Sequence, residues 1–492
     1  MNQQRAMESQ MPTRNTLRNA RAAAAALMLT AVTSQLGAQS AAELSEDVRN
    51  FVSVDAPVVA LTNATVIDGT GSAPRTSQTV LIRDGRIAAM GGDVAVPSDA
   101  HVVDLTGHTV IPGIVGIHNH LFYTAAGGRA VQMSFTGPRL YLASGVTTIR
   151  TTGGRSPYSE INTKAAIDAG HVPGPRVHLT APYITGSEDG SAGSMAPITS
   201  PDAARRFVSY WAAEGVEWLK AYTDISRASL GAAIDEAHNR GLKVTGHLCS
   251  VSYEEAVALG IDNLEHGMMA STDFVSDKPL DTCPVNNVIS LAQADPTGSD
   301  AQRVIETMLA NNVSMTSTLA VYEPMVPGRP TKDQRTLEMM APEVRESYMR
   351  LRNQIDNSGT SAYTADVFRR AMAFERAFVQ AGGLMGAGVD PTGIGGALAG
   401  FGDQRNYELL IEAGFSPVEV VQIMSLNGAR ILGIDERLGS LEVGKVADIV
   451  VLNGDLTAAP DVIRNVTTVF KDGVGYDSVK LLAVVRGRVG IN

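Results

Sequence analysis

Cysteines, aromatic residues and positive charge are all scarce in this sequence, and each shortage excludes a class of protein. Two cysteines cannot hold 492 residues together as a disulfide-stabilised scaffold. Aromatic residues make up only 5% of the chain, which does not favour a groove of stacked aromatic rings for carbohydrate or single-stranded DNA. Lys and Arg number 40 against 51 Asp and Glu, a net charge of −11, which argues against a nucleic-acid-binding protein.

Long hydrophobic runs are also absent beyond the first forty residues. No later stretch reaches the roughly 18 consecutive apolar residues of a membrane-spanning helix. Apolar residues nevertheless make up 44% of the chain, which is enough for a large core. At this length we expect either several domains or one barrel of about 250 residues with a smaller partner domain.

The first forty residues have the pattern of a secretory signal peptide. A basic leader precedes a largely apolar segment, residues 22–32, that is too short to cross a bilayer, and small residues follow at 37–42. We therefore expect residues 1–40 to be removed and the mature protein to be periplasmic or secreted. Export would expose Cys249 and Cys283 to an oxidising compartment, but the sequence does not decide whether they pair.

Short β-like segments occur towards both ends of the sequence. Residues 58–113 contain apolar segments separated by the hairpin signals Asp68-Gly69 and Asp84-Gly85. Residues 432–492 return to the same pattern. The simplest account is one small β-sandwich domain, 58–113 plus 432–492, that both ends of the chain build together.

Residues 114–431 alternate strand-like and helical segments. The strand-like segments are 145–150, 176–179, 217–220, 242–247, 263–266, 313–316 and 384–388. Amphipathic segments such as 229–240 and 252–259 lie between some of them. This alternation predicts an α/β fold with a parallel sheet covered by helices, and eight such units would form a (β/α)₈ TIM barrel over 114–431.

Polar side chains that can bind a metal follow several of these predicted strands. His118 and His120 end the apolar run 111–117, and their spacing puts both imidazoles on one face of a strand. Later segments end in the same way at Lys220, His247, His266 and Asp390. Each side chain alone is as well explained by a buried hydrogen bond, a helix cap or a surface lysine.

Together these side chains are stronger evidence for a metal site, because the carboxyl ends of the strands in a barrel converge on one mouth. Four imidazoles, a carboxylate and a lysine at one mouth suit Zn²⁺ or another borderline divalent ion. An ammonium group cannot ligate a metal, so Lys220 must lose its proton or be modified.

Several of these segments resemble the strand motifs of the metal-dependent amidohydrolase superfamily. The segment 112–120 (PGIVGIHNH) is similar to its strand-one motif and 145–150 (GVTTIR) to its strand-two motif, while 218–222, 246–247, 264–266 and 388–390 match later strands. The segment 439–450 is similar to the C-terminal sheet of the imidazolonepropionase-like and Xaa-Pro dipeptidase-like (ochratoxinase-like) branch. The resemblance extends over residues 58–489.

The resemblance implies a binuclear site with two divalent ions, most often Zn²⁺. It assigns His118, His120 and Asp390 to one ion, His247 and His266 to the second, and Lys220, carboxylated by CO₂ to a carbamate, to the bridge between them. Two ions that share one water make hydroxide available near neutral pH. Asp390 would take the proton of that water and pass it to the leaving nitrogen.

The implied activity is cleavage of an amide C–N bond by a metal-bridging hydroxide, in a dipeptide, an N-acyl amino acid or a related amide. Tyr222 and Arg150 are candidate substrate contacts, Arg150 for a carboxylate; the alternatives are a packed aromatic ring and an internal ion pair. A lactone or phosphotriester hydrolase would use the same site, and an exported solute-binding protein is the non-catalytic alternative. We expect a small-molecule substrate, a homo-oligomer, and no nucleic acid or membrane span.

Overall fold

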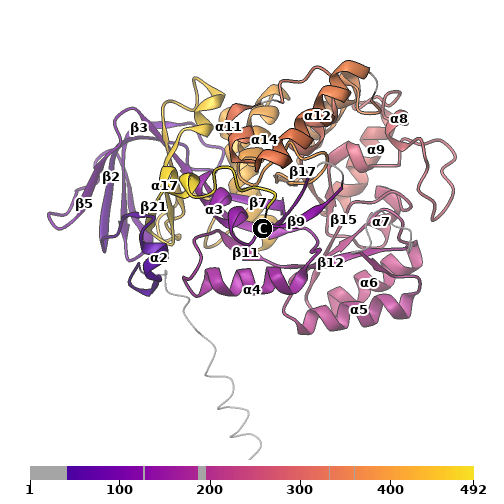
Figure 1. The fold of residues 1–492 in the computed structure, drawn as a ribbon, viewed down its shortest axis with the longest axis horizontal. Helices are drawn as coiled ribbons and strands as arrows, with labels where there is room; N and C mark the ends of the chain where they lie inside the picture. The colour runs from indigo at the N-terminus through magenta and orange to yellow at the C-terminus, as the bar shows by residue number, and fades with distance from the viewer. Residues whose placement is uncertain (1–40, 126–127, 187–194, 332, 360, 492) are drawn as a thin grey trace, which may run out of the picture.

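The computed structural model describes residues 41–125, 128–186, 195–331, 333–359 and 361–491 (Figure 1). The expected signal peptide, residues 1–40, lies outside the described residues. Two groups of strands organise the chain: a mixed sheet at one side of the molecule, and parallel strands that alternate with helices. In the described part of the chain, no helix is both long and apolar enough to cross a membrane.

The mixed sheet has nine strands, which come from early and late parts of the chain. The early strands are β1 (Val52–Val54), β2 (Val58–Val66), β3 (Arg75–Arg83), β4 (Arg86–Gly91), β5 (His101–Asp104) and β6 (His108–Pro112). The late strands are β19 (Ile449–Asn453), β20 (Val466–Lys471) and β21 (Val474–Asp477). The order is β1-β21-β20-β19-β6-β2-β3-β4, with β5 paired to β2. Because β19 pairs with both β20 and β6, late strands complete the sheet that early ones begin.

Turn chemistry and burial account for this sheet. Asp84 and Gly85 link β3 to β4, and both have positive φ, as a tight two-residue hairpin requires. The other hairpin signal, Asp68-Gly69, lies in the longer connection between the paired strands β2 and β3. Apolar residues of β2, β3, β6, β19 and β20 pack together in a core of their own.

Parallel strands fill the middle of the chain. They are β7 (Ile114–Asn119), β10 (Val146–Thr151), β11 (Arg176–His178), β12 (Thr180–Thr185), β14 (Trp218–Ala221), β15 (Lys243–Gly246), β16 (Asn263–Glu265), β17 (Ser314–Ser317) and β18 (Met385–Ala387). One sheet has the order β11-β10-β7, and the second runs from β12 through β14 to β18, with the two-residue β13 (Ala196–Pro197) at its edge. The strands β7, β10, β12 and β14 are buried along their whole length, as expected of strands covered on both faces.

Helices follow most of the parallel strands and make this an α/β, TIM-barrel-like domain. The longer ones are α3 (Thr136–Ala143), α4 (Pro157–Asp168), α5 (Pro201–Ala213), α6 (Arg227–Asn239), α9 (Ser299–Ala310), α12 (Pro342–Ser358), α13 (Ala365–Gln380) and α14 (Phe401–Glu412). Ser226 caps α6 by accepting a hydrogen bond from the Ser229 amide. Ser252 and Glu255 form a capping box at α7 (Tyr253–Ala258). Both helices match the amphipathic segments predicted from the sequence.

Shorter elements complete the fold. They are α2 (Glu46–Arg49), α8 (Asn287–Ser290), α10 (Leu319–Tyr322), α11 (Gln334–Met339), α15 (Pro417–Gln422), α16 (Gly428–Leu432), α17 (Ser478–Ala483) and the hairpin of β8 (Phe122–Thr124) with β9 (Ala130–Gln132).

Two contacts join the parallel sheets at their edges. The strands β11 and β12 are separated by Leu179 alone, and the Thr180 amide donates to Oγ1 of Thr151 in β10 at 3.0 Å. At the other edge, the Asp390 amide, beyond β18, donates to the His118 carbonyl in β7 at 2.9 Å. The carboxyl ends of the first and last strands therefore lie side by side.

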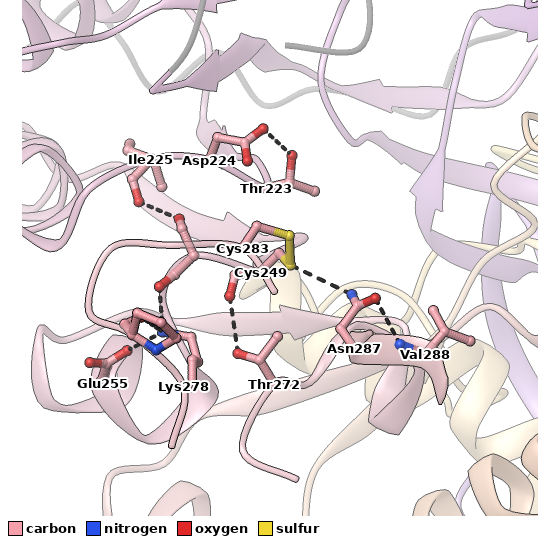
Figure 2. Close-up of a disulfide and its surroundings, with 12 residues drawn as sticks. Thr223, Asp224, Ile225, Cys249, Glu255, Thr272, Lys278, Cys283, Asn287 and Val288 are labelled. Carbon is pink, nitrogen blue, oxygen red and sulfur yellow. Dashed lines mark hydrogen bonds and ion pairs between the residues drawn. A yellow bond between two sulfur atoms is a disulfide. The ribbon is translucent and has the colours of Figure 1, made fainter. Parts of the chain in front are cut away.

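A disulfide ties the segment between β16 and α9 to the end of β15. Cys249 and Cys283 are bonded to each other (Figure 2), which answers a question that the sequence left open. The Thr272 hydroxyl donates to the Cys249 carbonyl at 3.1 Å, and the Asn287 side-chain amide lies 3.5 Å from Sγ of Cys249 (Figure 2). Because Cys249 is two residues beyond His247, the disulfide holds the chain close to a predicted ligand.

Candidate active site

The six side chains predicted as metal ligands lie together at the carboxyl ends of the parallel strands. They are His118 in β7, His120 just beyond it, Lys220 in β14, and His247, His266 and Asp390 just beyond β15, β16 and β18. All of them except His120 line a cavity of about 230 Å³. The convergence that the sequence predicted from strand ends is therefore present in the structure.

Asp390 lies between the two histidines of the His-x-His segment. Its Oδ2 is 3.4 Å from Nε2 of His118, and its Oδ1 is 3.3 Å from Nε2 of His120. Burial raises the pKa of Asp390, but His118 and His120 outweigh burial and hold that pKa below its usual range. Asp390 also has a φ of 46°, a strained conformation of the kind that clusters at functional sites. The site therefore holds an ionised carboxylate against both imidazoles.

Lys220 is a buried amine without a hydrogen-bond partner among the described residues. Its side chain is 1% exposed, and a carboxylate oxygen of Glu265 lies 3.8 Å from its Nζ. Burial lowers the pKa of Lys220 to about 8. The neutral amine, which is the form that reacts with CO₂, is therefore accessible near neutral pH.

His247 and His266 lie against each other, with their ring centres 4.3 Å apart. Nδ1 of His266 is 2.7 Å from the Thr318 hydroxyl, whereas its Nε2 is buried and has no partner in the described structure. Burial lowers the pKa of His247 to about 3 and the pKa of His266 well below its usual value. Both imidazoles are therefore neutral, which is the form that binds a metal.

This donor set fits a divalent metal. Ligand atoms of His118, His266 and Asp390 lie within 4.8 Å of one another. The unpaired Nε2 of His266 and Nζ of Lys220 add to this, because buried polar atoms are rarely left without a partner. Neutral imidazole nitrogens with a carboxylate oxygen suit Zn²⁺ or a similar ion.

Glu265, the last residue of β16, is a site residue that the sequence analysis did not single out. One of its oxygens is 2.7 Å from Nδ1 of His118, and the other accepts a hydrogen bond from Arg150 at 2.6 Å. Burial raises the pKa of Glu265, but Lys220, His118 and Arg150 outweigh it and lower that pKa well below its usual value. A carboxylate on the far nitrogen of a metal-binding histidine fixes its tautomer and orientation. The available signal was an acidic residue on a buried strand, which needs charged partners.

The two candidate substrate contacts differ in position. Tyr222 lines the cavity, and its ring centre is 5.0 Å from that of His247. Arg150 has no exposed surface and does not line the cavity. Its guanidinium pairs with Glu265 and lies 4.4 Å from the ring centre of Trp218. This position is the internal ion pair considered as the alternative, so we replace the expected substrate contact of Arg150 with a role in holding Glu265.

The sequence model of the amidohydrolase family matches residues 109–475, which include all six predicted ligands. This chain belongs to the amidohydrolase family. The resemblance inferred from the strand motifs is thereby confirmed. Among curated proteins the matches are short: a dihydroorotase of Mycobacterium tuberculosis is 52% identical over 42 residues, and an imidazolonepropionase of Vibrio cholerae is 45% identical over 53 residues. These matches cover 8% and 11% of this chain and span 10% and 13% of those relatives.

Several solved structures are similar over most of the chain. A proposed prolidase from Bifidobacterium longum is 25% identical with a TM-score of 0.61, over 87% of this chain and 98% of that one. A Xaa-Pro dipeptidase with bound methionine is 18% identical with a TM-score of 0.62, over 85% and 100%. An ochratoxinase from A. niger is 17% identical with a TM-score of 0.60, over 86% and 96%. The last two likenesses show a shared fold.

Proposed function

We propose that this protein is a binuclear metal-dependent hydrolase that cleaves the amide C–N bond of a dipeptide, an N-acyl amino acid or a related amide. The observation that carries the proposal is the convergence of six donors at one cluster of strand ends, where the Lys220 amine and Nε2 of His266 have no hydrogen-bond partner in the described structure. Membership of the amidohydrolase family supports hydrolysis as the reaction. The similarity to a proposed prolidase supports a peptide-like substrate.

Two divalent ions, in our proposal Zn²⁺, share the six donors. His118, His120 and Asp390 would hold one ion, His247 and His266 would hold the second, and Lys220, as a carbamate formed with CO₂, would supply a ligand to both. Carboxylation would turn a buried amine that lacks a hydrogen-bond partner into a bidentate anion, which would remove the cost of burying that amine without hydrogen bonds. Glu265 holds the ring of His118 in the orientation that ligation needs.

Asp390 carries the proton in this proposal. When bound, the two ions lower the pKa of water and polarise the scissile carbonyl. Asp390 is ionised, so it accepts the proton of the attacking water and delivers it to the leaving nitrogen. The Thr392 hydroxyl donates to Oδ1 of Asp390 at 2.7 Å and keeps the carboxylate in place during both transfers. Tyr222, beside His247, stays a candidate substrate contact.

The proposal includes a closed barrel and a composite second domain. Eight strand positions, β7, β10, β11 with β12, and β14 to β18, would form the barrel over residues 114–431. The hydrogen bond from the Asp390 amide to the His118 carbonyl supports its closure. The pairing of β19 with β6 supports the composite origin of the proposed β-sandwich domain, 58–113 plus 432–492.

We also propose that residues 1–40 direct export and that the mature protein is a homo-oligomer in the periplasm or outside the cell. The disulfide between Cys249 and Cys283 supports an oxidising compartment. N-terminal sequencing of the protein recovered from a bacterial periplasm tests removal of residues 1–40, and light scattering tests the oligomer.

A side-by-side substrate panel tests the reaction. Purified protein reconstituted with zinc is assayed with dipeptides, N-acyl amino acids, lactones and phosphotriesters. We expect hydrolysis of dipeptides or N-acyl amino acids that is lost on chelation and restored by Zn²⁺. Turnover confined to lactones or phosphotriesters would replace the amide assignment. A protein that holds no metal and only binds a solute would overturn the proposal.

A further inference from the structure

The cavity beside the six donors has a wall that the metal proposal does not use. Four tyrosines contribute to it, together with Met325, Val321 and one arginine; the tyrosines are Tyr183, Tyr222, Tyr322 and Tyr363. Among the described lining residues, Arg155 is the one cation outside the ligand set. The wall is therefore aromatic and apolar, with a single point of positive charge.

Arg155 lies in the connection between β10 and α4, on the same side of the site as His120. Its guanidinium carbon is 5.4 Å from the ring centre of Phe122, and that ring is 4.5 Å from the ring of His120. The neighbouring Tyr183 hydroxyl lies 3.3 Å from Nε2 of His120. A group bound by Arg155 would thus lie close to the donor cluster.

Arg155 forms no hydrogen bond or ion pair with any described residue, and its Nε is buried without a partner. Arg150, five residues earlier, contrasts with it, because Glu265 neutralises the Arg150 guanidinium. A guanidinium stays protonated in proteins and presents a planar fork of donors that matches a carboxylate. A partly buried guanidinium that lacks an acceptor is therefore suited to an anion that arrives with the ligand.

We infer that Arg155 binds a carboxylate of the substrate, so that the substrate class of this site is amides that carry a carboxylate next to a compact apolar group. This inference rests on the proposed function. The tyrosines and Met325 supply the surface for the apolar group. A cavity of about 230 Å³ lies below the roughly 300–1,000 Å³ of pockets for drug-sized ligands, which favours a small acyl amino acid or dipeptide.

Binding of ligands that cannot be hydrolysed tests this inference apart from catalysis. The probes are N-methylsulfonyl-leucine and N-methylsulfonyl-phenylalanine, each as the free acid and as the neutral carboxamide. Calorimetry on the zinc-loaded protein compares wild type with Arg155→Met and Arg155→Lys. Arg335→Met is the matched control, because Arg335 lines a different cavity and pairs with Asp333.

We expect the wild type to bind at least one acid about 10- to 100-fold more tightly than its carboxamide. Arg155→Met should lose this preference with little change in carboxamide affinity, Arg155→Lys should keep part of it, and Arg335→Met should behave as wild type. A preference that survives in Arg155→Met would overturn the inference. So would an equal loss for both ligands, or no measurable binding of either acid at millimolar concentration.

The two proposals can fail separately. A preference for acids that depends on Arg155, in a protein that hydrolyses no amide, would contradict the proposed reaction and leave the inference standing. Hydrolysis of neutral and anionic amides at rates that Arg155→Met does not distinguish would contradict the inference and leave the proposed reaction standing.

Discussion

The parallel strands end in two cavities that differ in what their polar groups do. The cavity at the amino ends, about 320 Å³, is larger than the one of about 230 Å³ at the carboxyl ends. At the amino ends, Lys243 donates to the Ile431 carbonyl at 2.9 Å, and Asp262 accepts a hydrogen bond from the Val244 amide at 2.8 Å. At the carboxyl ends, Nζ of Lys220 and Nε2 of His266 are buried and have no hydrogen-bond partner among the described residues.

The comparison shows that the volume of a cavity does not indicate which cavity is the active site. A structural cavity satisfies its own charges, whereas a site built for a ligand leaves donors that the ligand completes. The contrast agrees with the general rule that barrel-like domains carry chemistry at the carboxyl ends of their strands and stability at the amino ends.

The largest effect is expected from the two lysines on neighbouring strands. Lys220→Ala removes the proposed bridge between the ions, so nearly all activity and one or both metals should be lost. Lys243→Ala, at the opposite end of the sheet, should keep its metal and its activity and lose about 1 kcal/mol of stability with its hydrogen bond. Activity assays, elemental analysis and thermal unfolding of both variants measure this.

Added short carboxylates provide a second test of the difference between Lys220→Ala and Lys243→Ala. Formate or acetate added to Lys220→Ala should restore part of the activity by supplying the missing bridge, and should not affect Lys243→Ala. A Lys220→Ala protein with full metal content and the wild-type rate would refute the carbamate.

The second prediction concerns Asp390→Asn. Asparagine keeps the shape and one oxygen, but it cannot accept and return a proton near neutral pH. We therefore expect kcat to fall by about 10²–10⁴-fold with little change in KM, and metal content to fall less than in His118→Ala. Steady-state kinetics with parallel metal analysis measures both effects. A kcat near the wild-type value would show that Asp390 has a purely structural role.

The third prediction concerns Glu265→Gln. The amide removes the negative charge that holds the His118 ring and pairs with Arg150, so affinity for the metal should fall by about 10- to 100-fold. Competition with a chromogenic chelator measures the metal affinity of each variant. Glu375→Gln is the control, because this buried glutamate accepts a hydrogen bond from Ser317, and no hydrogen bond or ion pair joins it to any of the six proposed ligands in the described structure. Equal losses in both variants would mean that only folding had been disturbed.

The smallest effect is a pH dependence of stability from Glu160, near the start of α4. Burial raises the pKa of Glu160 to about 8 in the folded protein, against 4.5 for the exposed group. Between these values the folded state binds more protons than the unfolded state, so stability falls as pH rises. Glu160→Gln removes this loss, and its Tm relative to wild type should rise by about 2–5 °C from pH 5 to pH 8. A constant Tm difference across that range would show that Glu160 is already ionised in the folded protein.

The sequence could predict what depends on neighbouring residues along the chain. The strand ends at His118, Lys220, His247 and His266 follow apolar segments that are evident locally, and parallel strands bring such ends together. The strand β12 was missed because threonines and Pro182 interrupt its apolar pattern.

Contacts between distant strands could not be predicted in this way. The pairing of Arg150 with Glu265 depends on how β10 and β16 face each other inside the sheet, which no local pattern encodes. The disulfide likewise depends on the path of a long connection that returns to the end of β15. For the same reason Arg155 was not recognised as part of the cavity wall.

Elemental analysis of the purified protein tests the central claim most directly. After expression with added zinc, six donors that include a bridging carbamate should retain about two divalent ions per chain, more than one tetrahedral zinc requires. The Lys243→Ala variant should hold the same number and the Lys220→Ala variant fewer. A wild-type protein with well under one ion per chain would contradict the binuclear site and the reaction that depends on it.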